Sequence, residues 1–159
     1  ERYWIIDDTG FPKKGLHSVG VARQYCGQLG KQDNCQVAVS LSLATETASL
    51  PIAWRLYLPE AWAQDAERRL RAGVPETVQF QTKPEIALAQ VKAAQAAGTP
   101  GGMVLADAGY GNDTGFRDGR TEIGALYAVG VQGTTSVWAP GQQPLPPSPA
   151  DRRKEMNRA

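Results

Sequence analysis

The pattern of hydrophobic and polar positions predicts strands in the first third of the chain. Tyr3–Asp7 is a short apolar run that ends in an acid, as expected for a buried strand, and Thr9–Gly15 is rich in turn residues. Gln36–Thr45 ("QVAVSLSLAT") and Ile52–Leu58 ("IAWRLYL") alternate apolar and polar side chains, which is typical of half-buried strands. Ser18–Tyr25 fits a strand or a loop. Because short connections favour neighbours, the strands predict an antiparallel meander.

A helical pattern follows the strands. Pro59–Gly73 is charged and predicts a loop with a short helix. Thr82 and Glu85 have the spacing of a capping box, in which each side chain bonds to a backbone amide of the other residue. The helix that they start is expected to run through "EIALAQVKAAQAA" and to end at Gly98.

The next segments predict a parallel extension of the sheet. Met103–Ala106 is a continuous apolar run, as expected for a strand covered on both faces. Asn112–Leu126 is a weaker helix because it contains three glycines, and "LYAVGV" is the last strand. A strand, a helix and a second strand indicate a parallel crossover, so the pattern predicts an α/β fold. Its mixed sheet has three antiparallel strands extended by parallel ones, with flanking helices.

Composition sets the limits of this fold. The 159 residues suffice for one domain, 42% of them are hydrophobic, and no apolar run is long enough to cross a membrane. From Ala139 the chain is rich in proline, so we predict a domain over residues 1–138 and a disordered tail or linker over 139–159. The chain starts inside a strand without Met, which we interpret as an excised domain or a partial gene product.

Charge and cysteine content name no partner by themselves. The formal net charge is only +1, so DNA binding would depend on local basic patches and on metal. Cys26 and Cys35 lack the spacing of a zinc site. We expect reduced structural thiols in a cytoplasmic protein, with a disulfide as the alternative.

Two acidic positions each follow an apolar strand directly. Asp7 and Asp8 follow "WII", and Asp107 follows "MVLA". If the two strands are parallel neighbours, one acid of the first pair comes close to Asp107. Ligands gather at the carboxyl ends of such strands, so these acids are candidates for a binding site. Successive strand residues face opposite sides, so only one of Asp7 and Asp8 faces Asp107. Two carboxylates repel unless a cation intervenes, and Mg²⁺ suits such a pair; the alternative is an acidic loop that caps turn amides.

Basic residues lie near the first acids in the sequence. Lys13, Lys14 and Arg23 are candidates for contacts to DNA phosphates, although solvated turn lysines are common. His17 is more typical of a loop or core histidine than of a catalytic base.

Five segments resemble, in family order, blocks of bacterial insertion-sequence transposases of the DDE superfamily. They are "IDDTGFPKKG", "SVGVARQYCG", "NCQVAVSLSLA", "LPIAWRLYLPEAWA" and "VLADAGYG". The resemblance implies a ribonuclease H-like catalytic domain that cuts and rejoins DNA with Mg²⁺, for which Mn²⁺ substitutes. It implies that Asp7 and Asp107 are catalytic metal ligands and that Asp8 is a variable neighbour. The implied partners are double-stranded DNA at transposon ends and at the target, and a second transposase in a dimer. The implied location is the bacterial cytoplasm, on the nucleoid when DNA is bound.

One block of the family pattern is absent. The third catalytic acid is a Glu on a later helix, and neither Glu122 nor Glu155 has the expected context. The resemblance therefore predicts a partial catalytic domain that is inactive alone. The alternatives are another ribonuclease H-like nuclease, or a non-catalytic transposase remnant.

Overall fold

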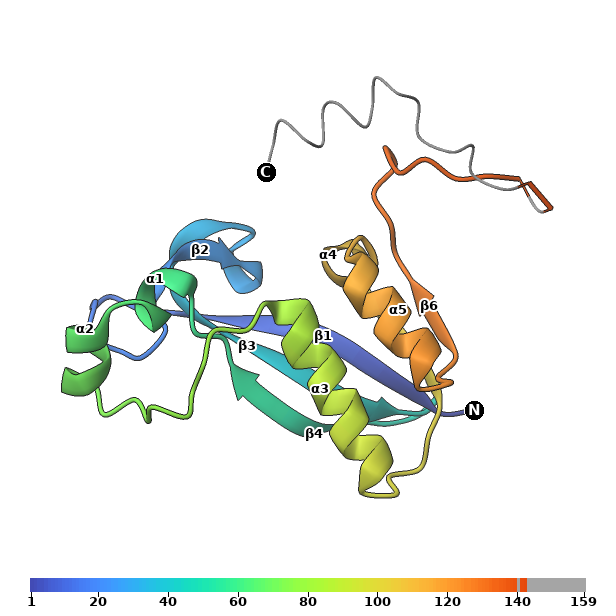
Figure 1. Cartoon of the computed structure of the whole chain (residues 1–159), viewed down its shortest axis with the longest axis horizontal. Coiled ribbons are helices and arrows are strands. Elements are labelled where there is room, and N and C mark those ends of the chain that lie inside the picture. The colour runs from blue at the N-terminus through green and yellow to red at the C-terminus, as the bar shows by residue number, and fades with distance from the viewer. Residues whose placement is uncertain (140, 143–159) are drawn as a thin grey trace.

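Six strands form one mixed sheet in the computed structural model, which describes residues 1–139, 141 and 142 (Figure 1). The strands are β1 (Tyr3–Pro12), β2 (Ala22–Cys26), β3 (Lys31–Ala44), β4 (Ser49–Leu56), β5 (Met103–Ala106) and β6 (Tyr127–Val129). The helices are α1 (Glu60–Ala63), α2 (Ala66–Arg71), α3 (Lys83–Ala96), α4 (Ala108–Gly111) and α5 (Thr114–Glu122), with a 3₁₀ turn, η1 (Gly27–Leu29).

The pairing of the strands confirms the predicted fold class. On one edge, β3 pairs antiparallel with β1; on its other edge, it pairs antiparallel with β2 along its first part and with β4 along its second. Beyond β1 lie β5 and then β6, both parallel to their neighbours. An antiparallel meander of β1, β3 and β4 is thus extended by two parallel strands, which is the arrangement of a ribonuclease H-like sheet.

The first strand is longer than the sequence predicts. The turn expected over Thr9–Gly15 is wrong at its start, because β1 continues in register with β3 as far as Pro12. Gly10 is a packing residue in this strand and not a turn residue. A Cβ at Gly10 would lie 2.8 Å from the sulfur of Cys26, so only glycine lets β1 and the end of β2 approach so closely.

The helix predicted from the capping box is present as α3. The Thr82 hydroxyl accepts a hydrogen bond from the Glu85 amide, and the Glu85 carboxylate accepts one from the Thr82 amide. After the helix ends, Gly98 has a φ of +69°, a left-handed conformation that favours glycine. Gln90 on the buried side of α3 donates a hydrogen bond to the carbonyl of Val39, which fixes the helix on the sheet.

The long helices cover one face of the sheet. In Figure 1, α3 and α5 both lie in front of the strands. The core between them and the sheet consists of Trp4, Ile6, Val39, Leu41, Ile86, Ala87, Val91, Val104, Tyr110 and Phe116. Because side chains alternate along a strand, the even-numbered residues of β1 point into this core and the odd-numbered ones point to the opposite face.

The two cysteines are free thiols, which was the first of the two alternatives that the sequence left open. Cys26 and Cys35 are both buried and pack with Val37. Burial raises the pKa of the Cys35 thiol, with a further contribution from Cys26. Nearly all of the predicted tail falls outside the described residues. Among the helices that are described, none is long and apolar enough to cross a membrane.

Candidate functional site

Asp107 lies where β5 passes into α4. Its backbone is extended, and its carboxylate accepts a hydrogen bond of 2.9 Å from the amide of Gly109 while its side chain remains exposed. Glycine makes this tight passage possible, because a Cβ on Gly111 would lie 1.9 Å from the carbonyl oxygen of Gly130. The segment "DAGYG" therefore presents one carboxylate at the end of a strand and turns at once into a helix.

The strand register aligns Asp7 with Asp107. Ile5 pairs with Leu105 in the parallel ladder of β1 and β5. Two residues further along both extended segments come Asp7 and Asp107, which have the same parity and are both exposed. The predicted parallel neighbours are therefore confirmed. Asp7 does not end its strand, however, because β1 runs on for five more residues.

Asp8 points to the helix-covered side of the sheet. Its carboxylate forms an ion pair with the ammonium group of Lys83, the first residue of α3. Both side chains are about 30% exposed, so the pair is only partly screened by water. The ammonium also lies 5.8 Å from the ring centroid of Tyr57. Asp8 therefore already has a cationic partner.

Tyr110 lies three residues after Asp107, on α4. Its ring is in the core and its hydroxyl group is buried, with no hydrogen-bond partner among the described residues. Burial raises the pKa of Tyr110, and the negative charges of Asp8, Asp107 and Asp7 raise it further, in that order. The hydroxyl group of Tyr110 is therefore held in its neutral form.

This donor set suits a hard divalent cation that also binds a substrate phosphate. Carboxylate oxygens are the preferred ligands of Mg²⁺, which is often held by one or two carboxylates, with water and phosphate completing its shell. The ordered carboxylates of Asp7 and Asp107 supply two such groups. Among the described residues, however, no three His, Cys, Asp or Glu side chains are grouped so as to hold a metal. The site fits a metal that needs further ligands.

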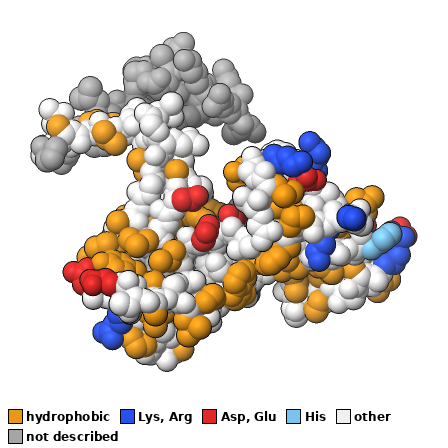
Figure 2. Space-filling model, turned by 180° about the vertical axis from the view of Figure 1, so that it is seen from behind, with side chains coloured by type: hydrophobic (Ala, Val, Ile, Leu, Met, Phe, Trp, Pro, Cys, Tyr) orange, Lys and Arg blue, Asp and Glu red, His pale blue; other side chains and the backbone are white. Residues whose placement is uncertain are grey.

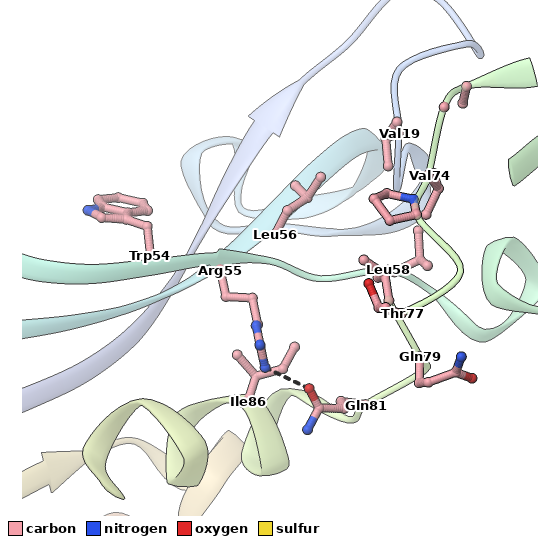
Figure 3. A pocket seen from close by; sticks show the side chains of 14 residues that line it. Val19, Trp54, Arg55, Leu56, Leu58, Val74, Thr77, Gln79, Gln81 and Ile86 are labelled. Carbon is pink, nitrogen blue, oxygen red and sulfur yellow. Dashed lines mark hydrogen bonds between the residues drawn. The ribbon is translucent and has the colours of Figure 1, made fainter. Parts of the chain in front are cut away.

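A separate pocket lies away from these acids. It has a volume of about 560 Å³ and lies between β4 and the segment 72–81 (Figure 3). Arg55 projects into it and donates a 2.7 Å hydrogen bond to the side chain of Gln81. Its lining includes no acid, cysteine or histidine, so the Thr77 hydroxyl group has no base in the pocket to activate it. The carboxylates remain the better candidate for chemistry.

The predicted basic residues gather at the far end of β1. The side chain of Asn34 donates hydrogen bonds to the carbonyls of Lys13 (2.7 Å) and Gly15 (3.0 Å), and its backbone pairs with Arg23 on β2. Lys13, Lys14 and Arg23 are exposed. They do not adjoin the acids as their place in the sequence suggested, because the extension of β1 separates them. Figure 2 shows acidic side chains near the centre of one face and basic ones to one side.

Two residues of this site were not predicted as such. The sequence position of Lys83 could have indicated its role. The helix dipole disfavours a cation in the first turn of a helix, so a lysine there suggests an acidic partner elsewhere. Tyr110 was not singled out from the sequence. Its signal was weaker, since a tyrosine between glycines is common in turns and only the fold places its ring in the core.

The comparisons with known proteins concern the family of the chain as a whole. A family model described as "DDE superfamily endonuclease" matches residues 1–158. Over 129 residues the chain is 36% identical to a protein of Microchaete diplosiphon named "Probable transposase for insertion sequence element IS701". That alignment covers 80% of this chain but only 31% of the relative, so the chain spans about a third of the relative's length. No solved structure matches.

Proposed function

The chain belongs to the DDE superfamily of endonucleases, and from this premise we propose that it is part of a transposase that cuts and joins DNA at the ends of an insertion sequence. The observation that carries the proposal is the pair of exposed carboxylates in a ribonuclease H-like sheet: Asp7 on β1, and Asp107 directly after β5, the parallel neighbour of β1. The proposed partners are double-stranded element ends, target DNA and a second transposase. The proposed place of action is the bacterial cytoplasm, at the nucleoid.

In this proposal Asp7 and Asp107 are the metal ligands that the chain supplies. Bound Mg²⁺, or Mn²⁺ in its place, would activate the attacking oxygen and stabilise the leaving oxygen of a DNA phosphodiester. The protein's own task is to hold its carboxylates in fixed positions. A central strand fixes Asp7, and the hydrogen bond from the Gly109 amide orients Asp107. Phosphoryl transfer asks little more of a protein than placement and charge.

The reaction would proceed in two chemically similar steps. Water first attacks a phosphodiester at the element end, the bond to the 3′ oxygen breaks, and that oxygen leaves as a 3′ hydroxyl group. The freed 3′ hydroxyl then attacks a phosphodiester of the target and displaces another 3′ oxygen, so the number of phosphodiester bonds is conserved in the second step. A nuclease that only hydrolyses DNA would stop after the first step, so a strand-transfer assay separates the two functions.

We propose that this chain alone is inactive. Two carboxylates would have to neutralise the charge that three neutralise in the complete site, and no third acid joins them in the described part. The relative is about three times as long as the matched segment, so a longer protein has room for the missing glutamate. Robust cleavage by the purified 159-residue chain, lost on Asp107→Asn, would contradict this point.

Asp8 is the second candidate for the first metal ligand. It is the next residue along β1, and its side chain points to the helix-covered side of the sheet, where it pairs with Lys83. Its ion pair with Lys83 would then be exchanged for the metal. The strand register favours Asp7, because Asp7 and Asp107 have the same parity on neighbouring parallel segments.

The experiment that tests the proposal is Asp107→Asn in a longer protein that includes the glutamate-bearing region. The substitution keeps the shape of the side chain and removes its charge, so cleavage of element-end DNA should be abolished while DNA binding is retained. Asp118→Asn on α5 is the matched control, because Asp118 is also exposed and lies outside the site. Full cleavage by the Asp107 variant would overturn the proposal.

A further inference from the structure

We propose that a basic groove between β2, the loop 13–18 and α2 binds the backbone of duplex DNA about half a helical turn from the phosphate that is cleaved. The groove is lined by Arg23, Arg68, Arg71 and His17, with Trp62 among its apolar lining residues. The binding surface stands on its own observations. The distance from the cleaved phosphate rests on the proposed function.

The groove concentrates positive charge in a chain that is nearly neutral overall. The net charge of the sequence is +1, yet the groove, with a volume of about 740 Å³, has three arginines and no acid in its lining. Its three arginines come from two separate elements: Arg23 from β2, and Arg68 and Arg71 from α2. Folding therefore brings together cations that are almost fifty residues apart, as expected for a surface that binds a polyanion.

Arg68 forms a fixed wall of the groove. Its guanidinium group lies 3.7 Å from the centre of the Trp62 ring and donates a 2.9 Å hydrogen bond to the carbonyl of Leu16. Trp62 itself is buried and donates a 2.7 Å hydrogen bond to the carbonyl of Val21. The stack ties α2 to the basic loop and to β2, so the charges are positioned before a ligand arrives.

Arg23 and Arg71 are the groups available to a ligand. Both are exposed, and the contact between Arg71 and Glu67 is long, at 3.8 Å, and exposed on both sides. Such a contact is weak and is readily exchanged for a phosphate oxygen. Guanidinium groups suit phosphates because their N–H groups form paired hydrogen bonds.

The floor of the groove favours a duplex backbone over unpaired bases. Single strands are usually bound by aromatic rings on which bases stack. Here the Trp62 ring is only 1% exposed and is covered by Arg68, so no base can stack on it. A groove of cations without a free aromatic face fits phosphate contacts, which position a duplex without reading its sequence.

The length of β1 sets the distance between the groove and the acids. Six residues separate Asp7 from Lys13, which corresponds to about 20 Å along a strand. Lys13 is held by Asn34, and Asn34 also lines the groove. Base pairs of duplex DNA are spaced by about 3.4 Å, so a phosphate at the acids and one at the groove would be about six base pairs apart.

The test uses the double variant Arg23→Ala/Arg71→Ala and the wild-type 159-residue chain. The affinity of each for a 20-base-pair duplex of random sequence is measured over about 50 to 200 mM salt. Each lost phosphate contact should lower the slope of log affinity against log salt by about 0.9. The wild type should therefore lose about twelvefold more affinity than the double variant over this fourfold range of salt. Lys92→Ala, an exposed cation on α3, is the control and should match the wild type.

Several outcomes would overturn the inference. They are no binding of the duplex by the wild type at about 50 mM salt, an unchanged slope in the double variant, or an equal change in the Lys92 variant. Direct binding of a polyglutamate peptide, with no binding of the duplex, would show that the groove binds acidic protein instead. The proposed function fails separately, through cleavage by the Asp107→Asn variant of the longer protein. A crosslink from a residue at the groove to a duplex position two or fewer base pairs from the cleaved phosphate would contradict the spacing.

Discussion

The two functional regions of this molecule share one strand and are built differently. Near β5, β1 carries Asp7 and Asp8, each fixed by the strand, and Asp8 is also held by Lys83. At its far end, β1 leads into Lys13 and Lys14. Their loop is held by a backbone hydrogen bond from the Lys13 amide to the Asn34 carbonyl and by two hydrogen bonds from the Asn34 side chain. The acidic region therefore has fixed backbone positions, whereas the basic region has long, exposed side chains.

This difference matches what each region has to do. Carboxylates that hold a metal act only when they are placed within a fraction of an ångström, and strand register with a helix cap supplies such placement. Contacts to phosphates act through charge, which declines slowly with distance, so flexible lysines and arginines suffice. We therefore expect a single substitution in the acidic region to abolish most of the activity. A single substitution in the basic region should lower DNA affinity only moderately.

The largest expected effect separates Asp7 from Asp8. In the longer protein, Asp7→Asn should lower the rate of cleavage about a thousandfold, because about 4 kcal/mol of transition-state stabilisation is lost with a metal ligand. Asp8→Asn should lower it by no more than about tenfold, because its charge is already balanced by Lys83. Single-turnover cleavage of element-end DNA measures both. A larger loss for the Asp8 variant would transfer the ligand role to Asp8.

The next effect concerns the basic loop. Lys13→Ala with Lys14→Ala should reduce DNA affinity about tenfold at moderate salt and lower the salt slope by about two units, one for each lost phosphate contact. Asp107→Asn should leave both quantities nearly unchanged. Fluorescence anisotropy over a salt series measures them for the two variants side by side. If the lysine variant kept the wild-type slope, these lysines would be solvated turn residues only.

Local signals were sufficient to predict much of the fold. Alternation along Gln36–Thr45 predicted the greater part of β3, and the apolar run Met103–Ala106 has the bounds of β5. The spacing of Thr82 and Glu85 predicted the start of α3. Each of these patterns depends on residues that are close in the sequence. Tertiary contacts therefore did not change the secondary structure that the pattern predicts. Asp107 directly follows the apolar run that forms β5, as the pattern predicted, whereas Asp7 lies inside β1.

The features that escaped prediction depend on contacts between distant residues. Gly10 indicated a turn locally, but its contact with Cys26 makes it a strand residue. Arg120 is a similar case, since a polar helix such as α5 gives no sign that one of its arginines is fully buried. Burial lowers the pKa of Arg120 to about 10. Its guanidinium nitrogens have no hydrogen-bond partner among the described residues, and the guanidinium carbon lies 5.8 Å from the centroid of the Phe116 ring.

A smaller effect links the acids to α3. Lys83→Met removes the cation that now neutralises Asp8, so the acidic region should bind Mn²⁺ about fivefold more tightly, which corresponds to about 1 kcal/mol. Calorimetric titration of the 159-residue chain measures this affinity, and Lys92→Met on the exposed side of α3 is the control. An affinity that is unchanged or lower would show that Lys83 lies outside the field of the metal site.

The smallest effect tests whether Asn34 organises the basic region. Asn34→Ala removes two hydrogen bonds to the carbonyls of Lys13 and Gly15. Both carbonyls belong to exposed residues that water can reach, so the free energy of unfolding should fall by only about 1 kcal/mol. DNA affinity should fall about two- to threefold, because the loop must then be ordered when DNA binds. Mn²⁺ affinity should not change, since β1 keeps its register with β5.

Gln32→Ala, at an exposed position of the same strand, is the control. Denaturant titrations and anisotropy measure the first two quantities. A loss of Mn²⁺ affinity in the Asn34 variant would mean that the two regions of β1 are coupled and not independent.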